Sequence, residues 1–138
     1  MTRRESREQA FVLLFEKSFQ ADVTMEEIIS VGVENELMEN DEFAQQLALT
    51  AWNNLEKIDG VIEESLVGWR MNRISKVALA VLRLAVCEIL YFDDVPVGAT
   101  INEAVELGKK YGGQDDFSFV NGILGTVAKK YAATEGEQ

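Results

Sequence analysis

The segment Val77-Ala-Leu-Ala-Val-Leu-Arg-Leu-Ala-Val-Cys-Glu-Ile-Leu90 decides the fold of this chain. Its apolar side chains fall on nearly every side of a helix, and only Arg83 and Glu88 interrupt them. A helix that is apolar all round is a buried, central one. The residues Asp93-Asp94-Val95-Pro96 then stop it, because proline cannot continue a helix. We therefore expect a central helix over about residues 75–92, with other helices packed around it.

The residues before this segment carry the signals of four more helices. The capping-box patterns Thr2-x-x-Glu5 and Thr24-x-x-Glu27 predict a first helix over about residues 3–20 and a shorter second one. The first carries an apolar stripe that we expect to face the core: Ala10, Phe11, Leu14, Phe15 and Phe19. Asn40 or Asp41 is expected to cap a third helix with apolar residues as far as Ile58. Asp59 is expected to cap a fourth, whose inner face carries Ile62, Leu66 and Trp69.

Two helices are expected after the central segment. One covers about residues 99–111 and ends at Gly112-Gly113, which is typical of a left-handed C-cap. The last covers about residues 115–131 and begins at two aspartates, which are favourable at a helix N-terminus. Asn121-Gly122 could instead mark a hairpin turn, but its flanks lack the alternation of strands. Gly122 and Gly125 therefore predict a small-residue face that another helix approaches closely.

Together these patterns predict an all-α fold, a compact single-domain bundle of about seven helices. Of the 138 residues only one is proline, 47% are apolar and 27% are charged, as in a globular protein. We place the domain at residues 1–133 and a frayed tail at 134–138. No apolar run approaches the ~20 residues that span a bilayer, and the N-terminus does not resemble a signal peptide. With its single cysteine, Cys87, the chain is expected in the cytoplasm.

The residue types present exclude most enzymatic sites. The chain has no histidine, which excludes Ser-His-Asp and Cys-His catalysis and histidine-ligated zinc. One cysteine cannot form a thiolate zinc or iron–sulfur site. No nucleotide-binding loop is present. We therefore expect a non-enzymatic protein that requires no metal and no cofactor.

Arg3, Arg4 and Arg7 form the strongest cluster of positive charge in a chain whose net charge is −11. Their spacing places all three on one side of the first helical turns. Cations at a helix N-terminus oppose the helix dipole and repel one another, which hints at a bound anion. A solvated helix end, screened by Glu5 and Glu8, is the structural alternative.

Two further groups of residues allow both structural and functional interpretations. Arg83 and Glu88 are expected to form a buried ion network, completed by Glu103 or Glu106, rather than a catalytic pair. Asp115 and Asp116 point to different sides of a helix, so N-terminal capping is favoured over Mg²⁺ binding. Phe117 and Phe119, two positions apart, cannot both face the same way. An exposed ring beside charged groups is a candidate for stacking on a nucleic-acid base.

Four ordered motifs, together with the arginine-rich N-terminal helix, resemble the NusB family. They are the Val77–Leu90 segment, Asp93-Asp94-Val95-Pro96, Ile101-Asn102-Glu103-Ala104-Val105-Glu106-Leu107 and Phe119-Val120-Asn121-Gly122. The resemblance spans the whole chain and implies an all-α transcription antitermination factor. Such a factor joins the ribosomal protein NusE on the boxA element of nascent single-stranded RNA. It promotes read-through by RNA polymerase, notably in ribosomal RNA operons, so other antitermination factors and the polymerase are indirect partners.

The resemblance also implies which residues contact RNA. The N-terminal arginine helix carries over to Arg3, Arg4 and Arg7, and the segment entering the central helix to Lys76. The start of the last helix contributes Asp115 and Phe119. Two alternatives stay open: an acidic helical adaptor that binds proteins without contacting RNA, and a homodimer that hides the arginine face.

Overall fold

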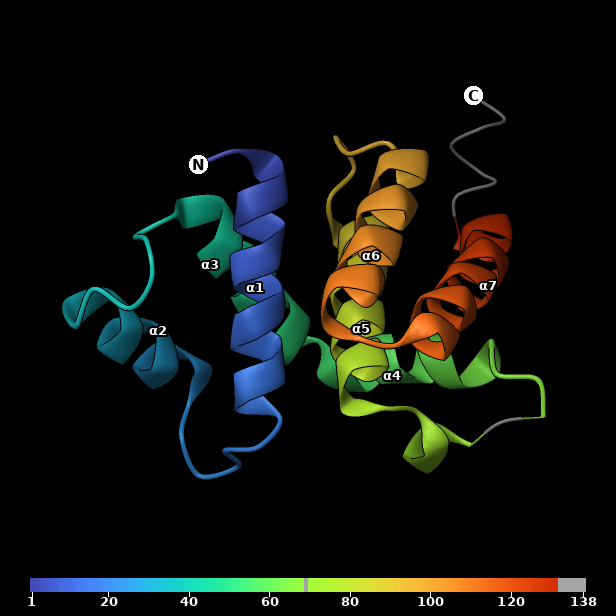
Figure 1. Ribbon diagram of the computed structural model, residues 1–138, viewed down its shortest axis with the longest axis horizontal. Helices are drawn as coiled ribbons and strands as arrows, with labels where there is room; N and C mark the ends of the chain where they lie inside the picture. The colour runs from blue at the N-terminus through green and yellow to red at the C-terminus, as the bar shows by residue number, and fades with distance from the viewer. Residues whose placement is uncertain (69, 132–138) are drawn as a thin grey trace.

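The computed structural model describes residues 1–68 and 70–131, and these residues form a helical bundle (Figure 1). The seven α-helices are α1 (Arg3–Lys17), α2 (Met25–Glu34), α3 (Glu42–Asn53), α4 (Leu55–Glu64), α5 (Lys76–Tyr91), α6 (Val97–Tyr111) and α7 (Gln114–Tyr131), and a short 3₁₀ helix, η1 (Met71–Arg73), precedes α5. The predicted all-α bundle of about seven helices is confirmed. Trp69 and the predicted tail at 134–138 lie outside the described residues.

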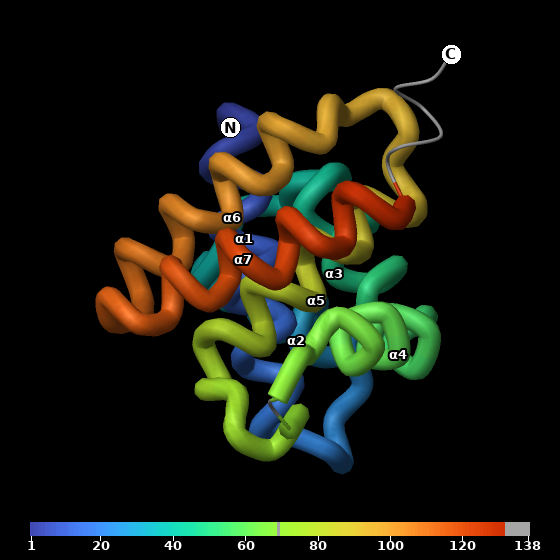
Figure 2. The backbone as a smooth tube through the Cα atoms, turned by 90° about the vertical axis from the view of Figure 1, so that its right-hand side faces the viewer, coloured from blue at the N-terminus to red at the C-terminus, as the bar shows by residue number. Residues whose placement is uncertain are grey.

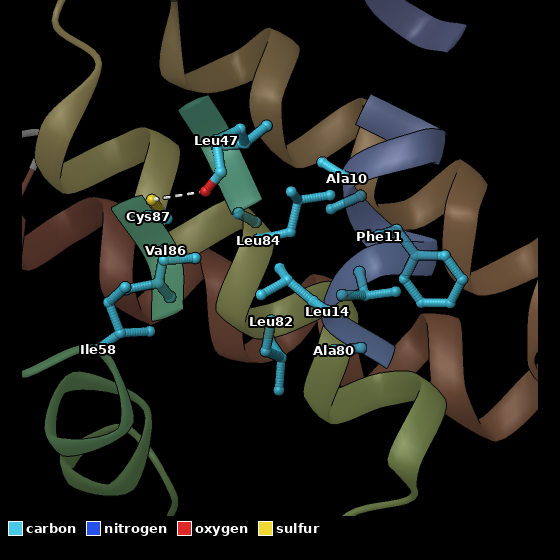
Figure 3. Close-up of a cluster of buried hydrophobic side chains, with 14 of the residues drawn as sticks. Ala10, Phe11, Leu14, Leu47, Ile58, Ala80, Leu82, Leu84, Val86 and Cys87 are labelled. Carbon is cyan, nitrogen blue, oxygen red and sulfur yellow. Dashed lines mark hydrogen bonds between the residues drawn. The ribbon is translucent and has the colours of Figure 1, made fainter. Parts of the chain in front are cut away.

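Helix α5 is central, as its sequence predicts. It packs against α1, α3, α4, α6 and α7. Leu82 and Val86 lie on one side of α5 and Leu84 on the opposite side, and each is at most 1% exposed. Figure 3 shows how side chains from α1, α3 and α4 surround them, and Figure 2 shows α6 and α7 side by side over α5. No helix in the described part of the chain combines the length and apolarity needed to cross a membrane.

Side-chain caps set the start of several helices, as the sequence indicates. Thr2, Thr24 and Asp41 each accept a hydrogen bond from the backbone N–H three residues ahead, and Thr2 and Glu5 complete a capping box. Ser75 caps α5 in the same way. The end of the first helix was predicted less well, because α1 stops at Lys17 and residues 18–20 form turns.

The predicted boundary between the third and fourth helices is wrong. The third helix ends at Asn53, and Asn54 separates it from α4. The Asn54 side chain donates a hydrogen bond to the Thr50 carbonyl oxygen, which satisfies an acceptor at the helix end. Asp59 consequently lies inside α4, where it binds Arg83 instead of capping a helix. Periodicity continued through Ile58 because both helices bury apolar residues in the same core.

The glycines of α6 and α7 also differ from expectation. Gly112 ends α6 in an extended conformation (φ −112°, ψ −170°), not a left-handed one. The Asp116 carboxylate reaches back to accept a hydrogen bond from the Gly113 N–H at 3.0 Å. No atom lies within 4 Å of a Cβ placed on Gly122 or Gly125, so the predicted close approach there is wrong. The close approach occurs at Gly108, where a Cβ would lie 3.1 Å from the Phe117 Cα.

Alanine substitutions at Gly108 and Gly122 should change the stability of the protein in opposite directions. In Gly108→Ala the new methyl group should collide with the α7 backbone, which cannot yield easily, at a cost of about 1–3 kcal/mol. The gain in helix propensity, about 1 kcal/mol, offsets only part of this cost, so the variant should be destabilised. Gly122→Ala should stabilise it slightly through helix propensity alone, since its surroundings are open. Urea denaturation of both variants tests this. Equal midpoints would show that α6 and α7 do not pack through Gly108.

Candidate nucleic-acid interface

Arg7, expected on an exposed phosphate-binding surface, is buried. Its Nε donates to both Glu88 carboxylate oxygens, at 3.0 and 2.9 Å, and only 7% of Arg7 and 1% of Glu88 are exposed. The Thr100 hydroxyl donates to the same carboxylate at 3.4 Å. The expected three-arginine surface is therefore wrong for Arg7. Helical spacing placed the three residues on one side of α1, but α5 covers the inner part of that side.

The expected pairing of Arg83 with Glu88 is also wrong. Arg83 forms a two-pronged bond to Asp59 of α4, from Nε and Nη2 to the two carboxylate oxygens, both at 2.9 Å. This pair is partly exposed. Glu103, a suggested third member of the network, binds Arg4 instead. Three separate ion pairs, Arg7–Glu88, Arg83–Asp59 and Arg4–Glu103, thus replace the single predicted network.

Arg3 and Arg4 remain at the surface, at the start of α1. The Arg3 guanidinium lies 3.7 Å from the centre of the Phe43 ring. Arg4 donates from Nε and Nη2 to the Glu103 carboxylate at 2.9 and 3.0 Å, and 66% of its side chain stays exposed. These hydrogen bonds hold the pKa of Arg4 above its usual value. Both cations are oriented by neighbours and remain accessible to an anionic ligand.

Lys76 lies at the opposite end of the bundle, in the first turn of α5 (Figure 1). Its ammonium nitrogen is 5.8 Å from the centre of the Phe19 ring. Phe19 was expected in the core, but it lies beyond the end of α1 and is 60% exposed. The structure therefore combines an exposed cation and an exposed ring at this end of the bundle.

A row of aromatic rings follows α1 between these two ends, and sequence analysis assigned it only to the core. Ring centres are 4.8 Å apart for Tyr111 and Phe11, 6.0 Å for Phe11 and Phe15, and 5.1 Å for Phe15 and Phe19. Tyr111 and Phe19, at the two ends of the row, are exposed. Lys110 and the Tyr111 hydroxyl both donate to Glu8, which lowers the pKa of that carboxyl. The repeat of phenylalanine every four residues was the available signal for this row.

Asp115 and Phe119 line a common pocket of about 430 Å³ at the start of α5 and α7. Arg73, Ile74, Ser75 and Ser118 also line it, and sequence analysis did not identify them. The Ser75 hydroxyl donates to Asp116 at 2.8 Å, which ties the first turns of the two helices together. Asp115 is exposed, and Phe119 is half-buried with part of its surface against the core. A carboxylate, a ring and a cationic side chain therefore lie around one opening.

The surface residues predicted from sequence thus form two groups rather than one. Arg3 and Arg4 lie at one end of α1, while Lys76, Asp115 and Phe119 lie where α5 and α7 begin, at the other end of the bundle (Figure 1). The 15 residues of α1 span ~22 Å, a distance that several nucleotides of single-stranded nucleic acid can cover. Within residues 1–68 and 70–131, no three potential metal ligands gather at one place. This arrangement suits an extended anionic ligand with bases that stack.

Comparisons with known proteins agree with this architecture. Residues 4–129 match the sequence profile of the NusB family. The transcription antitermination protein NusB of Acetivibrio thermocellus is 44% identical over 140 aligned positions, which cover 100% of this chain and 97% of that protein. A crystal structure of T. maritima NusB superimposes with a TM-score of 0.85 at 36% identity, covering 98% of this chain and 96% of that one.

A second solved structure contains partners. It is a complex of the antitermination factors NusB and NusE with double-stranded RNA, and it matches with a TM-score of 0.83 at 30% identity, covering 94% of this chain and 97% of that one. The sequence profile, the identity to relatives along the whole chain and the likeness of the fold agree. The chain belongs to the NusB family.

Proposed function

We propose that this protein is a transcription antitermination factor that binds boxA-type single-stranded RNA jointly with the ribosomal protein NusE. On this proposal the joint complex promotes read-through by RNA polymerase, notably in ribosomal RNA operons, and acts in the cytoplasm. The NusB family consists of transcription antitermination proteins and not of enzymes, so the expectation of a non-enzymatic protein is confirmed.

The pocket at the start of α5 and α7 is the observation that carries the proposal. A base stacked on Phe119 would place its polar edge near Asp115, whose carboxylate accepts hydrogen bonds from amino and imino groups. Arg73 lines this opening, and Lys76 follows Ser75, another lining residue, at the start of α5. Both cations can face phosphates there. Arg3 and Arg4 supply a second cationic contact at the other end of α1.

The charge balance of this chain favours a basic partner such as NusE in the RNA complex. A net charge of −11 opposes RNA binding, because neutralisation of phosphates supplies much of the affinity. A basic partner would complete the surface. A relative was solved together with NusE and RNA, which supports a joint surface here as well.

The test is a titration of labelled boxA-type RNA with the purified chain, alone and with NusE. We expect weak binding by the chain alone and tighter, sequence-dependent binding when NusE is added. A scrambled single strand serves as the control. Equal affinity for the boxA and scrambled strands in the presence of NusE would contradict the proposal. It would favour the acidic adaptor that binds proteins without reading RNA.

The salt dependence of this binding tests the arginine end of the surface. Each phosphate contact on single-stranded RNA adds about 0.7 to the log–log salt slope, so Arg3→Ala/Arg4→Ala should flatten the slope by roughly 1.4. Arg7 is buried and adds nothing to this number. Lys130→Ala is the matched control, because Lys130 pairs with Glu64 at the far end of α7 from the pocket. Identical slopes for the double variant and the control would remove Arg3 and Arg4 from the RNA surface.

A further inference from the structure

A groove between α1 and α2 exposes much of the apolar surface of this protein. Its volume is about 610 Å³. The exposed apolar residues along it are Val12 (44% exposed), Phe19 (60%), Val31 (54%) and Leu37 (78%). They are half of the large apolar side chains that the described residues expose. Apolar residues gathered in this way mark interaction sites more often than scattered ones do.

The turn after α2 keeps Leu37 in the open. Glu36 adopts a left-handed conformation (φ 55°), and the Leu37 N–H donates to the Gly32 carbonyl oxygen at 2.8 Å. The Glu36 N–H donates to the Val33 carbonyl oxygen at 3.1 Å, which completes a Schellman motif. In such a motif the residue at the Leu37 position often packs on a side chain one turn back, at the Gly32 or the Val31 position. Gly32 offers no side chain and Met38 lies over it, while Val31 is itself 54% exposed, so Leu37 remains 78% exposed beside the groove.

The charged side chains that line this groove are acidic. Residues 18–56 contain no lysine or arginine, and their acidic residues include Glu26, Glu27, Glu34, Glu36 and Glu39. Glu16 and Glu27 line the groove itself, and no basic residue does. Glu36 and Glu39 line the adjoining hollow at its Leu37 end. RNA is a poor occupant of an acidic groove, and so is a second copy of the same acidic surface.

We propose that this groove binds a basic amphipathic helix of a partner protein, a function additional to RNA binding. The apolar floor and the exposed side chains would receive its apolar stripe, and the glutamates would face its flanking lysines or arginines. The lining residues of α1 run from Gln9 to Glu16, a length of ~11 Å, which matches about two helical turns, and Phe19 extends this edge beyond the helix end. A helix of this length presents anchors at positions i, i+3 or i+4, and i+7.

A designed peptide is the probe. We would use a labelled helical peptide with leucines at i, i+3, i+4 and i+7 and lysines elsewhere, and a matched peptide with glutamates in place of the lysines. Fluorescence anisotropy with the full chain should show saturable binding of the lysine peptide and none of the glutamate peptide. Val31→Ser/Leu37→Ser should weaken the lysine peptide by about tenfold or more, since apolar burial is lost. Val67→Ser, at a side chain 85% exposed outside the groove, is the matched control.

A second pair of variants tests the charge. Glu16→Gln/Glu27→Gln should weaken the lysine peptide at low salt, and the difference should shrink as salt rises, because exposed charges are screened. Glu63→Gln, an exposed glutamate of α4, is the control. The proposal is overturned if the lysine peptide does not bind, or if the serine variant binds it like the wild type. Loss of RNA binding in the serine variant, or dissociation of a wild-type dimer by it, would also overturn the proposal, since RNA or a second copy would then occupy the groove.

Discussion

Replacing Arg7 by alanine is expected to lower the free energy of unfolding by about 3–5 kcal/mol. The change leaves the Glu88 carboxylate, which is 1% exposed, without the cation that binds both of its oxygens. The Thr100 hydroxyl, 3.4 Å away, would then be left to donate a hydrogen bond to this carboxylate. A buried charge without its counter-ion costs far more than an exposed one, because water cannot reach it.

Urea and thermal denaturation measure this effect, and two variants calibrate it. Arg4→Ala removes an arginine of the same helix from its pair with Glu103, but that pair is exposed on the Arg4 side and should contribute less than about 1 kcal/mol. Arg7→Met/Glu88→Leu removes both charges and should recover much of the loss, since apolar residues of similar size can replace a buried pair. An Arg7→Ala protein as stable as Arg4→Ala would show that the buried pair is not what joins α1 to α5.

The fold was largely predictable because its signals are local. The segment Val77–Leu90 is apolar on nearly every side of a helix, so it must be buried at the centre of the bundle, and this inference does not depend on where the other helices lie. Thr2, Thr24 and Asp41 act within three residues of themselves, so their caps can be identified without knowledge of the tertiary structure. The boundary at Asn54 was missed because the apolar period runs through it.

The pairing of charged residues was not predictable, for a physical reason. Helical periodicity gives the side of a helix on which a residue lies, but not which helix lies opposite. Arg7 and Arg83 both needed acidic partners, and the sequence offered many acidic residues for either. Only the packing of α1 on α5, and of α4 on α5, assigns Glu88 to the first and Asp59 to the second.

The candidate RNA surface was partly predictable. Asp115 and Phe119 do share a pocket, and Lys76 begins the helix that forms one wall of it. Arg73 and Ser75 were missed, because the sequence just before a helix does not distinguish a residue that lines a pocket from one that only caps the helix. The contacts of Arg3, Arg4, Lys76, Asp115 and Phe119 with RNA stay predictions.

Phe119→Leu is expected to weaken binding of boxA-type RNA by about 1–3 kcal/mol, the usual contribution of one base stacked on an aromatic ring. Leucine is used because Phe119 packs partly on the core, and an apolar side chain preserves much of that packing. Stacking releases no counter-ion, so the log–log salt slope should not change. This behaviour is the opposite of that expected for Arg3→Ala/Arg4→Ala, which changes the slope.

Phe117 provides the matched control for this experiment. It lies two residues earlier in α7, but it packs on Gly108 of α6, and the Lys109 ammonium is 5.3 Å from the centre of its ring. Phe117→Leu should therefore affect stability and leave RNA affinity unchanged, whereas Phe119→Tyr, which keeps an aromatic ring, should retain affinity. Affinities are measured with NusE present, at a temperature where each variant is folded. If Phe119→Leu and Phe117→Leu bind RNA equally well, no base stacks on Phe119 at this pocket.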